Sequence, residues 1–128
     1  MISVDNEFTK LRAFREEPRN AYFLPSALFH LPVIHRTAPR DWLDFAGAHG
    51  LRLFAAMPDR NALAHFEADF RGPTAIVFGG EGNGVSAELA EAAEHIHIPM
   101  AGAAESLNVA SSSAIILYEA FRQRRYNG

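Results

Sequence analysis

Residues 74–86 place a glycine-rich turn directly after an apolar run and directly before a serine that can begin a helix. Glycines let a backbone approach a ligand closely, and free N–H groups at a helix start favour polar or anionic ligands. In open α/β sheets, ligands bind at the carboxyl ends of strands, where this turn would lie. Its spacing matches neither the dinucleotide-binding fingerprint nor a phosphate-binding loop. The turn therefore indicates a binding site or, alternatively, a tight structural connection.

Residues 96–110 form the second segment that could do chemistry. A predicted strand ends at Pro99, a loop of small residues follows, and a helix begins with Ser106 and Asn108. Asparagine is a poor helix former, so its amide serves either for recognition or as a helix cap. We keep both interpretations at this point.

His95 and His97 are further residues whose spacing could suggest a site. They alternate along a predicted strand and so face the same side, which is how a metal site can begin. No third ligand is evident nearby, so we predict no metal site and favour a role at a strand edge or interface. The chain has no cysteine, which excludes thiolate chemistry and disulfides and fits a cytoplasmic location.

Four short apolar runs are the elements that would position these segments. Strands are predicted over residues 32–35, 51–56, 74–78 and 95–100. Nearly continuous apolar runs are typical of parallel strands that are buried on both faces. Helix-like segments alternate with them, so we predict an α/β fold: a parallel sheet with helices on both faces.

Three helices are predicted between and after these strands. One begins near Pro39, a favoured first helical residue, and a second is capped by Ser86. The last helix carries apolar residues at spacings of three and four, which predict its buried face. That predicted face consists of Leu107, Ala110, Ala114, Leu117, Tyr118 and Phe121. Near the N-terminus, Phe8, Leu11 and Phe14 predict a short helix that Pro18 ends.

Length and charge limit the class of protein. A chain of 128 residues is enough for one compact domain, and it lacks a run of about 20 apolar residues that could cross a membrane. A net charge of −3 argues against binding nucleic acid by bulk electrostatics and leaves room for a local basic patch.

The two chemical segments together resemble motifs of the SpoU (TrmH-like) family of RNA methyltransferases, in the SPOUT superfamily. Residues 77–86 resemble the family's G-x-E-x-x-G-[LV]-S strand and loop, and residues 98–109 resemble its I-P-M-x-G-x-x-x-S-L-N-V motif. Residues 117–124 resemble its L-Y-E-x-x-R-Q-R signature, and residues 26–33 and 50–56 match the family more loosely. The resemblance assigns residues 24–128 to a SpoU-like domain and leaves residues 1–23 unaligned.

The resemblance implies S-adenosylmethionine (SAM) bound in a C-terminal trefoil knot, and methyl transfer to a ribose 2′-hydroxyl of tRNA or rRNA. It places Glu81, Asn108 and Ser106 near the reacting centre, where they would orient the hydroxyl. It also implies a homodimer. The cofactor-binding residues it implies are Val77, Phe78, Gly79, Gly80, Ile98, Pro99, Met100, Leu107 and Ala110.

One family motif has no counterpart in this sequence. The family's first motif combines asparagine, glycine and an arginine credited with activating the ribose, yet the first glycine here is Gly47. We therefore expect an N-terminally truncated domain, whose exposed sheet edge would be covered by aromatic residues before Leu24 or by a second subunit. Two alternatives to an active enzyme stay open: a non-catalytic module that binds SAM or dimerises, and a gene fragment without activity.

Overall fold

The computed structural model describes residues 2–4, 11–15, 33–35, 38–79, 84–102 and 107–126, the first three ranges by their backbone. Its elements follow in this order: β1 (Ile2–Val4), β2 (Leu11–Arg15), β3 (Val33–His35), α1 (Pro39–Ala48), β4 (Arg52–Ala56), β5 (Leu63–Ala64), the 3₁₀ helix η3 (His65–Glu67), β6 (Thr74–Phe78), α2 (Ala87–Ala92), β7 (Glu94–His97) and α3 (Val109–Arg125).

The described strands form one sheet in the order β3-β2-β1-β6-β4-β7-β5. β4 lies between β6 and β7 and runs parallel to both, and β5 runs parallel to β7. These four strands confirm the predicted parallel sheet. β1 runs antiparallel to both of its neighbours, β2 and β6, so the sheet as a whole is mixed.

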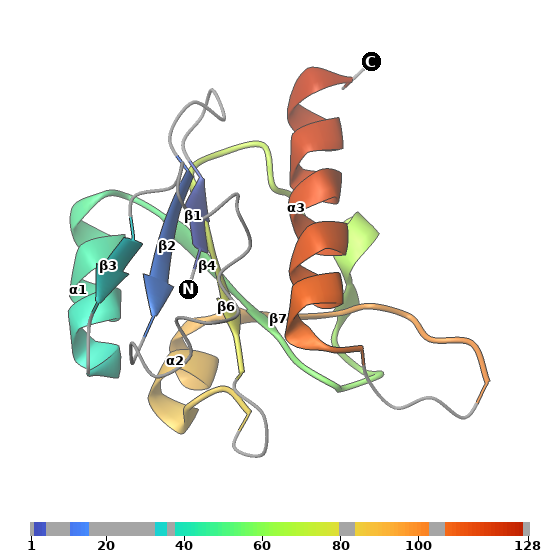
Figure 1. The fold of residues 1–128 in the computed structure, drawn as a ribbon, viewed down its shortest axis with the longest axis horizontal. Helices are drawn as coiled ribbons and strands as arrows, with labels where there is room; N and C mark the ends of the chain where they lie inside the picture. Colours follow the sequence, from blue (N-terminus) through green and yellow to red (C-terminus); the bar gives the residue numbers. More distant parts are fainter. Residues whose placement is uncertain are drawn as a thin grey trace.

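Alternate residues of the central strands pack on opposite faces of the sheet. On one face, Ala55, Ala75 and Val77 are buried together with Trp42 of α1 and Leu89 of α2. The other face is buried against α3 and the segment before β6, through Phe54, Ala68, Phe70, Ile76, Ile96, Ile116 and Ala120. Helices therefore cover both faces, as predicted, with α1 and α2 on one side and α3 on the other (Figure 1).

Local sequence explains where the first two helices begin. Pro39 occupies the start of α1, and the Ser86 hydroxyl accepts a hydrogen bond from the Leu89 N–H at the start of α2. After α1 the chain turns at Gly50, whose φ of 62° favours glycine. In the part of the chain that the structure describes, no helix is both long and apolar enough to cross a membrane.

The buried side of α3 differs from the predicted one. Ile116 and Ala120 are fully buried against the sheet, whereas Tyr118 is 67% exposed and Ala110 and Ala114 are exposed. Leu117 packs on the sheet side as predicted, but the prediction was wrong for Ala110, Ala114 and Tyr118. α3 carries apolar residues at helical spacing on two sides, and periodicity alone does not say which side meets the sheet.

Two polar side chains fasten the C-terminal end of α3 to the segment before β6. The Gln123 amide donates to the Ala68 carbonyl and accepts from the Phe70 N–H, each at 2.8 Å. Arg124 donates to the Phe70 and Gly72 carbonyls. The side chains of Gln123 and Arg124 thus provide hydrogen-bond partners for the backbone of residues 68–72, as a neighbouring strand would. These bonds also fix α3 relative to the sheet.

The predicted N-terminal helix is also wrong, because Leu11–Arg15 is a strand. β2 pairs with β1, and β1 pairs with β6 from Ile2↔Ile76 to Val4↔Thr74. Backbone pairing across the sheet outweighs the local helical spacing of the apolar residues. The edge of β6 is therefore covered by a strand of this chain, where we had expected aromatic side chains or a second subunit; Phe8, Tyr22 and Phe23 lie outside the described residues.

Candidate functional site

The parallel strands bring the two predicted binding segments to one edge of the sheet. In the register, Ala56 of β4 lies opposite Phe78 of β6 on one side and Ile96 of β7 on the other. Neighbouring strands lie about 4.8 Å apart, so Phe78 and Ile96 are about 10 Å apart at the same level. Both segments therefore leave the sheet where β4, β6 and β7 end, which we call the carboxyl edge.

The first segment leaves the carboxyl edge at Gly79. A β-carbon at Gly79 would lie 2.6 Å from Gly84 Cα and 2.7 Å from Val85 N, so the backbone before and after the loop meets here without room for a side chain. Val77 is 2% exposed and packs toward α1 and α2, while Phe78 packs toward α3. Only the backbone of Val77 is thus available to a ligand on the α3 side.

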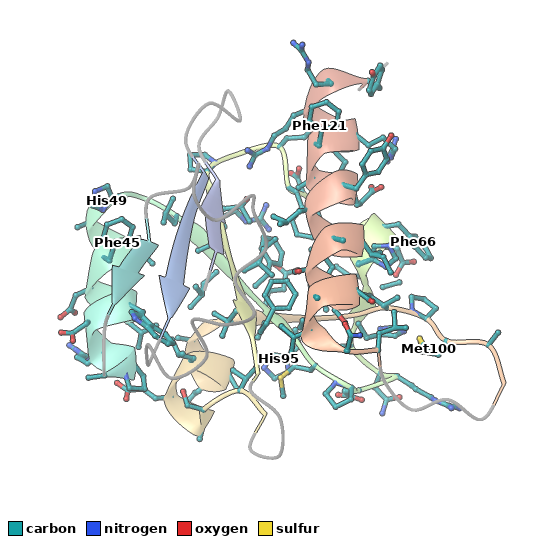
Figure 2. The ribbon with its side chains drawn as sticks, viewed as in Figure 1. Phe45, His49, Phe66, His95, Met100 and Phe121 are labelled. Carbon is teal, nitrogen blue, oxygen red and sulfur yellow. The ribbon has the colours of Figure 1, made fainter. Side chains whose placement is uncertain are left out.

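The second segment begins where β7 ends at His97, three residues earlier than the predicted strand end. Proline cannot donate a backbone hydrogen bond, which explains why pairing stops before Pro99. Ile98 packs on the same side of the sheet as Phe78 and Leu117 of α3. Pro99 is exposed and Met100 half-buried, on the loop that extends beyond the foot of α3 (Figure 2). Phe78 and Ile98 thus pack against the same core on one side of the sheet.

Asn108 begins α3 as its N-cap, so the capping interpretation is confirmed. Its Oδ1 accepts a hydrogen bond from the Ser111 N–H at 2.8 Å. The cap uses only the amide oxygen, and among the described residues the amide nitrogen of this exposed side chain has no partner. Leu107 is half-buried beside it, and Ala110 is exposed one residue inside the helix. Within the described part of the chain, the two N–H donors of the Asn108 amide are therefore not engaged.

Three of the predicted site residues lie outside the described residues: Gly80, Glu81 and Ser106. Their positions in the chain place Gly80 and Glu81 between Gly79 and Gly84, and Ser106 immediately before Leu107. Of the predicted site, the structure thus positions the two strand ends and the start of α3.

Sequence analysis missed a further part of the carboxyl edge. Ala56 and Leu63 both lie opposite Ile96, one on each side of it, so residues 57–62 cross the end of β7. We call residues 57–62 the arch. The Met57 N–H donates to the Ile96 carbonyl at 2.8 Å and so ties the arch down. A strand as short as β5 has no periodic pattern, and for this reason the sequence gave no sign of it.

The histidines form no metal site among the described residues, where no group of three suitable ligands comes together. The His95 ring is within 2.6 Å of the Ala90 carbonyl through Nε2, which ties β7 to α2. His65 and His97 each bury an Nδ1 that has no partner among the described residues. Burial lowers the pKa of His65, and the nearby Glu119 carboxylate opposes this shift.

Comparison with known proteins gives a family match over most of the chain. The model of the SpoU rRNA Methylase family matches residues 8–118. The chain is 42% identical, over 95 residues, to the tRNA (guanosine(18)-2'-O)-methyltransferase of Escherichia coli (strain K12), a match that covers 73% of this chain and 41% of that enzyme. It is 34% identical, over 113 residues, to the 23S rRNA (uridine(2479)-2'-O)-methyltransferase of Streptomyces viridochromogenes, covering 84% of this chain and 39% of that enzyme. The chain thus spans less than half the length of these relatives.

Solved structures share the same fold. The A. aeolicus TrmH/SpoU tRNA modifying enzyme superposes with a TM-score of 0.74 at 32% identity, covering 90% of this chain and 61% of that one. The SpoU methyltransferase AviRb from Streptomyces viridochromogenes, in complex with the cofactor AdoMet, superposes with a TM-score of 0.70 at 34% identity, covering 80% of this chain and 42% of that one.

Proposed function

The chain belongs to the SpoU rRNA methylase family, and on that premise we propose that it is a SAM-dependent methyltransferase that modifies a ribose 2′-hydroxyl of tRNA or rRNA. The register at the carboxyl edge carries the proposal, because Ala56 lies between Phe78 and Ile96. Two segments that resemble the family's cofactor loops thus leave the sheet about 10 Å apart. The names of the tRNA and 23S rRNA relatives, and the AdoMet bound to AviRb, support the same chemistry.

The residues at the carboxyl edge are of the chemical types that bind SAM. An adenosine needs apolar side chains against its ring and backbone N–H and C=O groups at its polar edges. Half-buried apolar side chains are present here in Phe78, Ile98, Met100 and Leu107. The close approach of the Gly79 and Gly84 backbones leaves no room for a side chain at position 79. The proposed cofactor residues are Val77, Phe78, Gly79, Gly80, Ile98, Pro99, Met100, Leu107 and Ala110.

When bound, SAM supplies a methyl group on a positively charged sulfur. The ribose hydroxyl must be held in line with that group, and its proton must be accepted. With Oδ1 engaged in the α3 cap, the Asn108 amide nitrogen is left to donate to a ribose oxygen. Glu81 accepts a hydrogen bond from the hydroxyl in this proposal, and Ser106 supplies a further hydrogen bond beside Asn108.

We extend the proposal to a trefoil knot in the C-terminal part of the chain. The arch supports it, because Ala56 and Leu63 flank Ile96 and the chain leaving β7 must pass one side of residues 57–62. If the chain leaving β7 passes beneath the arch, residues 99–128 are threaded through the loop that the arch forms. The knotted unit is residues 24–128 in this proposal, while β1 and β2 of the N-terminal segment 1–23 extend its sheet. We also propose that the protein works in the cytoplasm.

A homodimer is proposed from the outer side of α3. Ile115 and Tyr118 are 37% and 67% exposed there, although the sheet already covers the opposite side of the helix. Apolar residues on two sides indicate a helix that is buried twice. Sedimentation analysis should show a dimer that Tyr118→Asp converts to a monomer; a wild-type monomer would refute this part.

A non-catalytic SAM-binding module is the second candidate, because no Asn-x-Gly precedes Gly47 in this sequence. Titration calorimetry with SAM tests the pocket, and transfer of tritium from methyl-labelled SAM to unfractionated tRNA and rRNA tests catalysis. Binding together with transfer is the expected result. Binding without transfer favours the module, and loss of both refutes the proposed site.

A further inference from the structure

Arg60 stands at the centre of the arch, over the end of β7. The arch begins and ends beside Ile96, so its middle residues lie above the point where Ile98 leaves the sheet. The Arg60 side chain is exposed. It is therefore at the carboxyl edge, beside the end of β7 from which the second proposed cofactor segment leaves the sheet.

Ion pairing distinguishes Arg60 from the other arginines whose side chains the structure describes. Carboxylates hold Arg40, Arg52, Arg71 and Arg122. Arg124 is occupied by backbone carbonyls. Within this described set, Arg60 and Arg125 are left without a carboxylate partner, and Arg125 lies at the far end of α3. Among the side chains that the structure describes, Arg60 is thus the guanidinium at the carboxyl edge without a carboxylate partner.

The backbone that carries Arg60 is held on both sides. Met57 donates to the Ile96 carbonyl before it. Asp59 Oδ1 accepts from the Asn61 N–H at 2.9 Å, and the Asp59 carbonyl accepts from the Ala62 N–H at 3.1 Å. A side chain presented from an ordered turn loses less entropy when it binds.

We infer that Arg60 binds a phosphate of the RNA next to the ribose that is methylated, an inference that rests on the proposed function. A guanidinium donates two parallel hydrogen bonds to phosphate oxygens, which fixes orientation as well as affinity. In a chain of net charge −3, such a contact must be local, because the overall field does not attract RNA. Arg60 therefore sets the position of the substrate backbone over the cofactor.

The test compares wild type, Arg60→Ala and Arg60→Lys, with Arg125→Ala as the matched control. Binding of unfractionated tRNA is measured over a series of salt concentrations, together with SAM affinity by calorimetry. Arg60→Ala should weaken tRNA binding about 10-fold and reduce the slope of log K against log salt by about 0.7 to 1. Arg60→Lys should recover the slope and only part of the affinity. Arg125→Ala should change neither, and SAM affinity should stay constant throughout.

The outcomes separate this inference from the proposed function. Wild-type RNA binding that Arg60→Ala leaves unchanged in affinity and slope overturns the inference alone. Loss of SAM affinity in Arg60→Ala overturns it too, because the side chain would then belong to the cofactor site. A wild-type chain that binds neither tRNA nor rRNA overturns both.

Discussion

Replacing Gln123 with alanine should destabilise the fold far more than its place near the end of the chain suggests. Its amide satisfies the Phe70 N–H and the Ala68 carbonyl and also donates to Glu119 Oε1, each at 2.8 Å. Phe70 is fully buried and Ala68 is 3% exposed. Alanine at this position would leave both backbone groups without partners, in a place that water reaches poorly.

The expected loss is about 3 kcal/mol. A buried backbone group left unpaired costs about 1–3 kcal/mol, and two are affected, while the better helix propensity of alanine returns only a few tenths. An unfolding entropy of about 2.1 cal/mol/K per residue then predicts a fall in Tm of about 10 °C.

Urea unfolding at pH 7, followed by circular dichroism, measures this change. The midpoint should fall by about 1.5 M without a change in slope, for a slope near 2 kcal/mol/M. Arg125→Ala is the control, because its exposed side chain lies two residues further along α3 and should shift stability by less than about 0.5 kcal/mol. A loss below about 1 kcal/mol for Gln123→Ala would show that the amide does not fasten α3.

Three further substitutions test the site and its surroundings. Gly79→Ala should lower SAM affinity at least about 10-fold, because the new β-carbon would meet the Gly84 backbone. Gly47→Ala is the control and should leave SAM affinity unchanged, because nothing lies within 4 Å of its new β-carbon. Equal SAM affinities of the two variants by calorimetry would contradict the close approach at Gly79. Asn108→Asp keeps the helix cap but removes both amide donors, so it should abolish methyl transfer without lowering Tm. Full transfer activity in this variant would exclude hydrogen bonding of the Asn108 amide to the ribose. Burial lowers the pKa of His65 from 6.5, so the unfolded chain takes up a proton first as pH falls. Stability should therefore decline below about pH 6.5, and this decline should be smaller in His65→Gln; parallel curves of unfolding free energy against pH would refute the assignment.

Periodic and local features of the sequence predicted the central part of the fold. β6 was predicted with its observed bounds, because an apolar run between turn residues is typical of a strand buried on both faces. α1 and α2 begin where Pro39 and Ser86 indicated. Such features depend on neighbouring residues alone, and for this reason a single sequence reveals them.

Features that depend on distant pairing were missed or wrong. β2 is a strand because β1 pairs it to the sheet, and nothing within residues 11–15 outweighs their helical spacing. The hydrogen bonds of Gln123 reach back more than fifty residues, and a polar side chain with such partners resembles any exposed one in the sequence. For the predicted site, the spacing placed the two segments at strand ends. The distance between the two segments could not be predicted from the sequence, because it depends on the order of the strands, with β4 between β6 and β7.

The orientation of α3 about its own axis links the fold to the proposed dimer. Ile116 and Ala120 meet the sheet, while Gln123 and Arg124 hold the end of the helix in that orientation. We call the hydrogen bonds of Gln123 and Arg124 the clamp, because they fix the orientation of α3 and so direct Tyr118 outward. The clamp also sets the orientation of Asn108, which begins the same helix at its other end. Weakening the clamp should therefore reduce methyl transfer and dimerisation together, whereas Asn108→Asp should reduce transfer alone. That difference separates the residues that orient α3 from those that use its orientation.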